Sequence, residues 1–245
     1  MVVPRDRVEE ATAQMLELFP AGFVVEETAR EVELVAFTEE AGVRRLRERF
    51  GEVRTRQVLP GWESEWKRFH VPLVVGSLWI GPPWEQPPGE LTPILIDPGR
   101  AFGTGSHPTT RLCLELLHEL ERASVLDLGC GSGILAIAAA KLGFAPVIAA
   151  DSDEAAVEAT RANALRNGVE LAVRQVEALV DPLPEADLVV ANIDLATLEA
   201  LAPKLRFRLA LTSGYYESDV LSLAGFRHLG RRTDDEWAAD LFARG

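Results

Sequence analysis

The sequence predicts an α/β protein, in which a doubly wound parallel sheet follows a smaller α+β domain. From about residue 91 onward, apolar strand segments alternate with helical segments, the pattern of a parallel sheet covered by helices on both faces. Within that alternation, residues 125–143 (VLDLGCGSGILAIAAAKLG) read as an apolar strand, a glycine-rich turn and a helix, which together predict a Rossmann-like nucleotide site. Residues 1–58 carry the order βαββαβ, which predicts a ferredoxin-like domain.

The elements of residues 1–58 follow from the spacing of apolar residues and from breakers such as Pro20. We expect a stub strand at residues 1–3, a helix at 7–19, strands at 22–27 and 31–37, a helix at 39–50 and a strand at 52–59. Residues 59–90 are rich in proline, glycine and tryptophan and form the predicted linker. Because large aromatic residues do not suit a solvated tether, we expect this linker to pack on a domain, or alternatively to line a substrate groove.

The second domain, predicted over residues 91–245, contains the alternating elements. Strands are expected at 94–97, 124–128, 146–150, 171–176, 188–191 and 209–212, and helices at 109–120, 132–142, 154–167, 195–204 and 217–224. Residues 226–229 and 237–242 are expected to close the chain as a hairpin.

The composition is that of an ordinary globular protein. The 245 residues are 47% hydrophobic and 26% charged with a net charge of −13, so direct nucleic-acid binding is not expected. The acidic surface suits a basic, lysine-rich partner, or it serves only solubility. No apolar run has the length of a membrane span, and no signal peptide is evident. The two cysteines, Cys113 and Cys130, are too few for a disulfide framework, and we expect a cytoplasmic protein.

The glycine turn has the spacing G-x-G-x-G and consists of Gly129, Gly131 and Gly133. The third glycine of a dinucleotide fingerprint, G-x-G-x-x-G, would stand where Ile134 is found. The spacing favours S-adenosylmethionine over a nicotinamide dinucleotide. Asp127, before the turn, favours it too, since an acidic residue there suits a ligand with a charged amino-acid moiety. Asp151 ends the next strand, where a carboxylate accepts hydrogen bonds from ribose hydroxyls.

Polar residues at two further positions are candidates for chemistry. Asn192 follows the strand at 188–191, whose end lies beside the ligand in a doubly wound sheet. A methyltransferase would hold an amine lone pair there toward a sulfonium methyl; alternatively, Asn192 or Asp194 caps the following helix. His107 stands where the helix at 109–120 begins and is either a cap or a candidate proton acceptor. No metal site is expected, because no cysteine or histidine stands at ligand spacing from His107.

Several segments together carry a family resemblance. They are DPGRAFGTGSHPTTR at residues 97–111, the glycine turn, AADSD at residues 149–153 and VVANI at residues 189–193. They resemble the PrmA family, bacterial methyltransferases that modify lysine and N-terminal amines of ribosomal protein L-eleven. The FGTG-x-H-P-T-T pattern is more specific than the glycine turn, which most class I methyltransferases share. The connector pattern G-W-x-x-x-W-K and the small first domain are similar too, so the resemblance covers nearly the whole chain.

The resemblance implies a class I methyltransferase domain that uses S-adenosylmethionine, and a ferredoxin-like domain that grips a protein substrate. Four residues match cofactor-contacting positions, namely Thr110, Gly129, Asp151 and Asn192. A loop containing Phe102, Gly103 and Thr104 would fold over the cofactor, and Phe102 joins Asn192 and His107 as a candidate catalytic residue. The implied partner is a basic large-subunit ribosomal protein, and we expect a monomer without membrane association.

The sequence departs from the family pattern on the substrate side. Asp194 replaces the leucine of an N-I-L run, the P-G-G turn before the fifth strand is missing, and Tyr215-Tyr216 stand where aliphatic residues are usual. Two alternatives therefore stay open: a methyltransferase of the same fold with another protein or small-molecule substrate, and a non-catalytic, cofactor-binding module associated with the ribosome. A nicotinamide oxidoreductase is disfavoured by Ile134.

Overall fold

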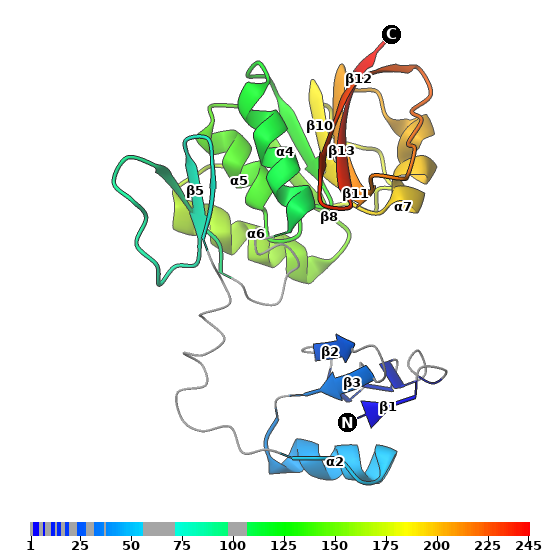
Figure 1. Cartoon of the computed structure of the whole chain (residues 1–245). Coiled ribbons are helices and arrows are strands. Elements are labelled where there is room, and N and C mark those ends of the chain that lie inside the picture. The colour runs from blue at the N-terminus through cyan, green and yellow to red at the C-terminus, as the bar shows by residue number, and fades with distance from the viewer. Residues whose placement is uncertain are drawn as a thin grey trace. The chain divides into compact units, whose positions relative to one another are not determined.

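The computed structural model describes residues 2–4, 7, 11–12, 14–15, 18–19, 24–27, 32–36, 38–55, 72–97 and 107–245. The chain divides into two compact units, Met1–Glu65 and Trp66–Gly245 (Figure 1). The division falls within the predicted linker at residues 59–90, and the later part of that linker belongs to the second unit.

The first unit is built on a three-stranded antiparallel sheet with the order β1-β3-β2. Its elements are β1 (Val2–Val3), β2 (Val24–Glu27), β3 (Val32–Val35) and α2 (Glu40–Phe50). Residues 11, 12, 14, 15 and 18 of the predicted helix at 7–19 are helical, and Met15 packs with Leu34 and Leu46 in the core. The predicted strand at 52–59 is not formed over residues 52–55, and residues 56–59 lie outside the described residues. The strand that would complete a ferredoxin-like sheet is therefore not shown.

The second unit begins with a small sheet in the order β4-β5-β6. Its strands are β4 (Leu73–Val75), β5 (Leu78–Gly81) and β6 (Thr92–Leu95). Gly76, with a φ of 55°, supplies the left-handed turn between β4 and β5. We expected the strand at 94–97 to join the main sheet, but the observed β6 pairs with β5 instead. Trp79 is 4% exposed, so this part of the predicted linker packs within its unit.

The main sheet of the second unit has seven strands in the order β12-β13-β11-β10-β7-β8-β9. They are β7 (Val125–Leu128), β8 (Val147–Asp151), β9 (Ala172–Gln175), β10 (Leu188–Asn192), β11 (Leu209–Tyr216), β12 (Phe226–Asp234) and β13 (Trp237–Arg244). Strands β7 to β11 are parallel, and β13 runs antiparallel to both β11 and β12. The predicted parallel sheet and closing hairpin are confirmed.

Helices cover both faces of this sheet (Figure 1). One face is covered by α4 (Pro108–Glu119), α5 (Ile134–Lys141) and α6 (Glu154–Asn167), and the other by α7 (Leu195–Leu201) and the 3₁₀ helix η3 (Ala202–Lys204). Successive side chains of a strand point to opposite faces. Val190 of β10 accordingly packs in the core below α4 and α5, and Val189 packs in the core below α7.

Two predicted helices differ from the structure. The helix predicted at 195–204 ends at Leu201 and continues as η3, because Pro203 has no N–H for a helical hydrogen bond. The helix predicted at 217–224 is wrong. Leu221 and Leu223 are buried while residues 220, 222 and 224 are exposed, so burial repeats every two residues, as in an extended segment.

Candidate active site

The carboxyl ends of three parallel strands meet where the order of the main sheet reverses. Strand β7 lies between β8 and β10, and the chain leaves β7 for β8 and β9 before it returns to β10 on the other side. Such a switch point is the usual place for a ligand in an open α/β sheet. The residues at these strand ends are Gly129 after β7, Asp151 in β8 and Asn192 in β10. The structure thus brings together three of the predicted site residues.

The turn after β7 needs glycine at each of the three glycine positions of its G-x-G-x-G pattern, because all three backbones are left-handed. The φ angles are 75° at Gly129, 53° at Gly131 and 81° at Gly133. A Cβ at Gly129 would lie 2.4 Å from Cγ2 of Ile193, and one at Gly133 would lie 2.8 Å from Cγ2 of Thr160. The turn therefore packs closely against Ile193, which follows β10, and against α6. It leads directly into the first turn of α5 at the switch point.

Asp151 holds the middle of the glycine turn. Its Oδ2 accepts a hydrogen bond from the N–H of Gly131 at 2.9 Å, and its Oδ1 accepts one from the N–H of Asp153 at 3.0 Å. The carboxylate is partly exposed at the end of β8. Because each carboxylate oxygen can accept a further hydrogen bond, Asp151 can also serve a ligand.

Asp127, in β7 before the turn, forms a hydrogen bond with the first turn of α5. It is 1% exposed, and its Oδ2 accepts a hydrogen bond from the N–H of Ala136 at 2.9 Å. Burial raises the pKa of Asp127 to about 7, with a smaller contribution in the same direction from the charge of Asp151. The sequence-based interpretation assigned Asp127 to the ligand, whereas the observed contact assigns it to the helix start.

Asp127→Asn is expected to remove a pH dependence of stability. The folded-state pKa of about 7 lies above the unfolded value of about 3.9, so the folded protein keeps a proton that the unfolded chain releases. This stabilisation is complete below about pH 4 and is lost as the pH rises to about 7. The variant keeps an acceptor for the N–H of Ala136. Its stability relative to the wild type should therefore rise by up to about 3 kcal/mol between about pH 5 and about pH 8.

Urea unfolding at the two pH values measures this difference, with Asp153→Asn as a control at an exposed cap. Equal pH dependence in the wild type and Asp127→Asn would contradict the burial argument.

The start of α4 is held by His107. Its Nδ1 accepts a hydrogen bond from the N–H of Thr109 at 3.3 Å and lies 2.7 Å from Oγ1 of Thr109, which makes His107 the N-cap. The ring also meets the edge of Trp237, with centroids 4.6 Å apart. Burial lowers the pKa of His107. Thr110, a predicted cofactor contact, is 3% exposed in the first turn of this helix.

Asp194, and not Asn192, caps α7. Oδ1 of Asp194 accepts from the N–H of Thr197 at 2.9 Å, and Oδ2 accepts from Oγ1 of Thr197 at 2.6 Å. These hydrogen bonds lower the pKa of Asp194. Of the two alternatives for the cap, the structure selects Asp194. Asn192 is left as the partly exposed last residue of β10.

Two buried residues of α6 support the turn and were missed in the sequence. Oγ1 of Thr160 donates to the carbonyl of Gly131 at 3.0 Å, and Nδ2 of Asn163 donates to the carbonyl of Ser132 at 2.9 Å. Their spacing of three residues on one helix face was the available signal.

Three predicted site residues, Phe102, Gly103 and Thr104, lie outside the described residues. Within the described ranges, no group of three or more histidine, cysteine, aspartate or glutamate residues could hold a metal ion.

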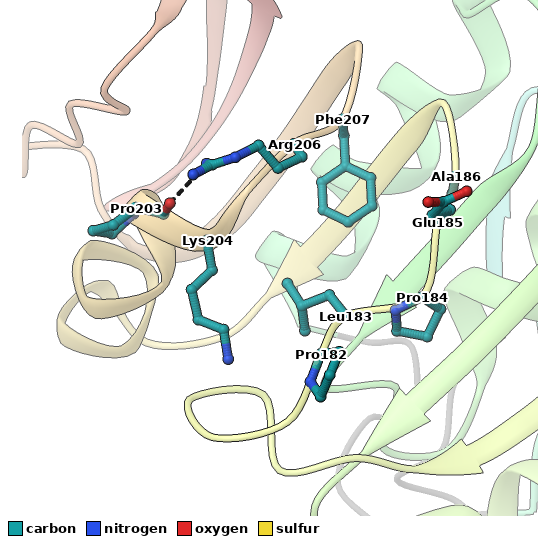
Figure 2. A pocket seen from close by; sticks show the side chains of 9 residues that line it. All are labelled: Pro182, Leu183, Pro184, Glu185, Ala186, Pro203, Lys204, Arg206 and Phe207. Atoms are coloured by element: carbon teal, nitrogen blue, oxygen red, sulfur yellow. Dashed lines mark hydrogen bonds between the residues drawn. The ribbon is translucent and has the colours of Figure 1, made fainter.

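A cavity of about 590 Å³ lies elsewhere in the second unit (Figure 2). It is lined by Pro182, Leu183, Pro184, Glu185, Ala186, Pro203, Lys204, Arg206 and Phe207. Residues 186 and 207 precede β10 and β11, so the cavity lies at the amino edge of the sheet, opposite the switch point.

Among the helices of the described residues, none has both the length and the apolar content that a membrane span requires.

The strand order, the antiparallel β13 and the glycine turn at the switch point define the fold of a class I methyltransferase. The chain belongs to the PrmA family, since the family described as "Ribosomal protein L11 methyltransferase (PrmA)" matches residues 5–222. The resemblance stated from the sequence is confirmed.

Individual relatives agree with this assignment. The chain is 45% identical over 182 residues to a ribosomal protein L11 methyltransferase of Shewanella woodyi, which covers 67% of this chain and 60% of the relative. It is 45% identical over 189 residues to one of Klebsiella pneumoniae, covering 74% of this chain and 62% of the relative. The chain thus spans about three fifths of the length of these curated relatives. A crystal structure of a ribosomal protein L11 methylase from Lactobacillus delbrueckii subsp. bulgaricus aligns with a TM-score of 0.65 and 32% identity, covering 71% of this chain and 98% of that one.

Proposed function

We propose that this chain is an S-adenosylmethionine-dependent protein N-methyltransferase that acts on lysine and N-terminal amines of ribosomal protein L11. Membership of the PrmA family and the names of the relatives support both the reaction and the substrate. The observation that carries the proposal is the switch point, where Asp151 is bound to the glycine turn and Asn192 ends the strand on the other side of it.

The residues at the switch point fit this cofactor. Among the contacts of the described residues, each carboxylate oxygen of Asp151 accepts a hydrogen bond from one backbone N–H. Each oxygen can accept a further hydrogen bond, so the carboxylate offers acceptors for two ribose hydroxyls. The left-handed Gly131 brings backbone close to that carboxylate without a side chain. The cofactor supplies a methyl group on a positively charged sulfur, which makes the methyl electrophilic. We propose Thr110, Gly129, Gly133 and Asn192 as further cofactor contacts, with Asp127 acting through α5.

Asn192 is the proposed positioning group for the amine. Its side-chain oxygen accepts an N–H of the neutral amine and aims the nitrogen lone pair at the methyl carbon. A nitrogen–carbon bond forms as the carbon–sulfur bond breaks, and the product ammonium keeps the positive charge or passes a proton to water. A lysine with a pKa near 10.4 is neutral about once in 2,500 molecules at pH 7, and burial of the amine in the complex would favour the reactive neutral form. We assign His107 no proton transfer in this reaction, because its Nδ1 accepts the hydrogen bond from the N–H of Thr109 that caps α4.

Further assignments belong to the same proposal. Phe102, Gly103 and Thr104 form a loop that folds over the cofactor, and residues 1–58 complete a ferredoxin-like domain that grips the substrate. The order β1-β3-β2, antiparallel throughout, supports the latter, since it is the order of the first three strands in a βαββαβ fold. The net charge of −13 supports a basic protein partner and not direct nucleic-acid binding. A ribosomal substrate implies a cytoplasmic enzyme, and we propose that it works as a monomer.

Calorimetric titration with S-adenosylmethionine and with NAD tests the cofactor, and transfer of a labelled methyl group to purified L11 tests the reaction. We expect heat with S-adenosylmethionine only and label in L11. Tight NAD binding, or no heat with S-adenosylmethionine, would refute the proposal. Binding without transfer to any protein would favour a non-catalytic module, and label in other proteins of a ribosomal extract would favour another substrate.

A further inference from the structure

Two stacked aromatic rings stand at the carboxyl edge of the sheet. The rings of Tyr216, the last residue of β11, and Trp237, the first residue of β13, lie 4.6 Å apart with an interplanar angle of 27°. His107 meets Trp237 edge-on at 4.6 Å. Tyr216 is 51% exposed, whereas Trp237 is partly buried. The exposed ring of Tyr216 is therefore held against Trp237, and the pair presents an aromatic face to the surrounding solution.

This pair lies on the same face and the same edge of the sheet as Asn192. Asn192 is paired with Ser213 of β11, and two residues earlier in each strand the paired Val190 and Leu211 pack in the core with α4. Tyr216 is three residues further along β11, at most about 10 Å, and its stacking partner Trp237 meets the ring of His107, the cap of α4. A side chain directed at Asn192 from solution can accordingly pass over the ring of Tyr216.

A bulge in β11 gives the two adjacent tyrosines opposite positions. The register shifts between Ser213 and Tyr215, at Gly214 with a φ of 101°. Tyr215 is 2% exposed, and its hydroxyl donates to Oδ2 of the buried Asp240 at 2.8 Å. Tyr215 therefore belongs to the core on the α7 side, and Tyr216 is left free of that network on the α4 side.

The charges around the pair are mostly negative. Carboxylates flank it on both neighbouring turns, namely Glu217 and Asp219 on one and Asp235 and Glu236 on the other. The nearby arginines are engaged: Arg111 pairs with Asp234, and Arg231 binds the carboxylate of Asp240. An aromatic face within a negative environment attracts an organic cation, and such contacts are worth about 0.5–1 kcal/mol at exposed sites.

We propose that Tyr216 and Trp237 receive the alkylammonium side chain of the protein substrate, so that Tyr216 is a specificity-determining positioning residue. This inference rests on the proposed function. The lysine stem lies along the ring of Tyr216, the ammonium is held over the aromatic face near the carboxylates, and the amine loses its proton to water on its way to Asn192.

The test compares two small probes on the whole chain. One probe is Nα-acetyl-Nε-trimethyllysine amide, and the other is its neutral isostere with carbon in place of the quaternary nitrogen. Binding is followed by NMR titration of the tryptophan indole N–H signals, and Trp237→Phe identifies the relevant signal. We expect the wild type to bind the cation about threefold more tightly than the isostere. Tyr216→Phe should keep this preference, and Tyr216→Ala should lose it.

Leu165→Ala is the matched control, since Leu165 is an 84% exposed apolar residue on α6. It should leave the preference unchanged. In methyl transfer, Tyr216→Ala should raise KM for L11 about threefold or more with the Kd for S-adenosylmethionine unchanged. No preference for the cation in the wild type, or a preference that survives Tyr216→Ala, would overturn the inference while methyl transfer by the wild type upheld the proposed function. A preference that depends on Tyr216 in a protein that transfers no methyl would support the cation site and refute the function.

Discussion

Replacement of Asp151 by alanine is expected to weaken S-adenosylmethionine binding by about 30- to 100-fold, which corresponds to about 2–3 kcal/mol. The loss has two parts. The proposed ribose hydroxyls lose a charged acceptor, and the N–H of Gly131 loses the oxygen that holds the turn at 2.9 Å. Hydrogen bonds to charged groups contribute about 1.5–3 kcal/mol each, so either part alone would give a measurable effect.

Calorimetry on Asp151→Ala and Asp151→Asn separates these contributions. Asparagine keeps an oxygen for the N–H of Gly131 and loses the charge, so its affinity should lie between those of the wild type and the alanine variant. Asp153→Ala is the control, because Asp153 caps α6 through the N–H of Ala155 and belongs to the same turn. It should cost about 1 kcal/mol of stability and leave the affinity unchanged. Equal affinities for the wild type and Asp151→Ala would remove Asp151 from the cofactor site.

Replacement of Asn192 by alanine is expected to lower kcat about 100-fold while the Kd for S-adenosylmethionine changes only a few-fold. The reason is that in-line transfer depends on the direction of the amine lone pair, and Asn192 is the partly exposed polar residue at the end of β10. Fold stability should change little, since Asp194 and not Asn192 caps α7.

Single-turnover transfer with saturating cofactor and L11 measures this effect separately from binding. Asp194→Asn is the control two residues away, since asparagine is also a good helix cap and keeps an oxygen for the N–H of Thr197. Its kcat should stay close to that of the wild type. A large loss in Asp194→Asn together with a small loss in Asn192→Ala would exchange the roles of the two residues.

Elements with their own start and stop signals could be predicted from the sequence. The helix predicted at 154–167 has the bounds of α6, because Asp153 caps its start and Gly168, with a φ of 62°, ends it. The helix predicted at 217–224 had no comparable signals, and its two leucines are buried in an extended segment. The strand predicted at 94–97 overlaps the observed β6 only at residues 94 and 95, and its partner β5 could not be inferred from apolar spacing.

The candidate site shows the same limit. Gly129, Asp151 and Asn192 could be placed together because parallel strands end at one edge of a sheet. The choice between Asn192 and Asp194 as cap could not be made, since both types of side chain cap helices and the two residues stand next to the same helix start. The stack of Tyr216 on Trp237 was not foreseen, because it joins two strands across the bulge at Gly214.

Strand β7, the glycine turn and α5 show both what the sequence determined and what the tertiary structure decided. The amino-acid sequence alone specified the type of site and its preferred ligand, because the three glycines, Ile134 and Asp151 act through backbone geometry and charge within one short segment. Only the tertiary structure showed that Asp127 binds the start of α5, that Asp194 caps α7 and that Tyr216 stacks on Trp237 at the carboxyl edge of the sheet. The contacts of Asp127 and Asp194 are with N–H groups nine and three residues further along the chain, and apolar periodicity does not say which polar side chain makes them. The contact of Tyr216 with Trp237 joins two strands and follows from the packing of the whole unit.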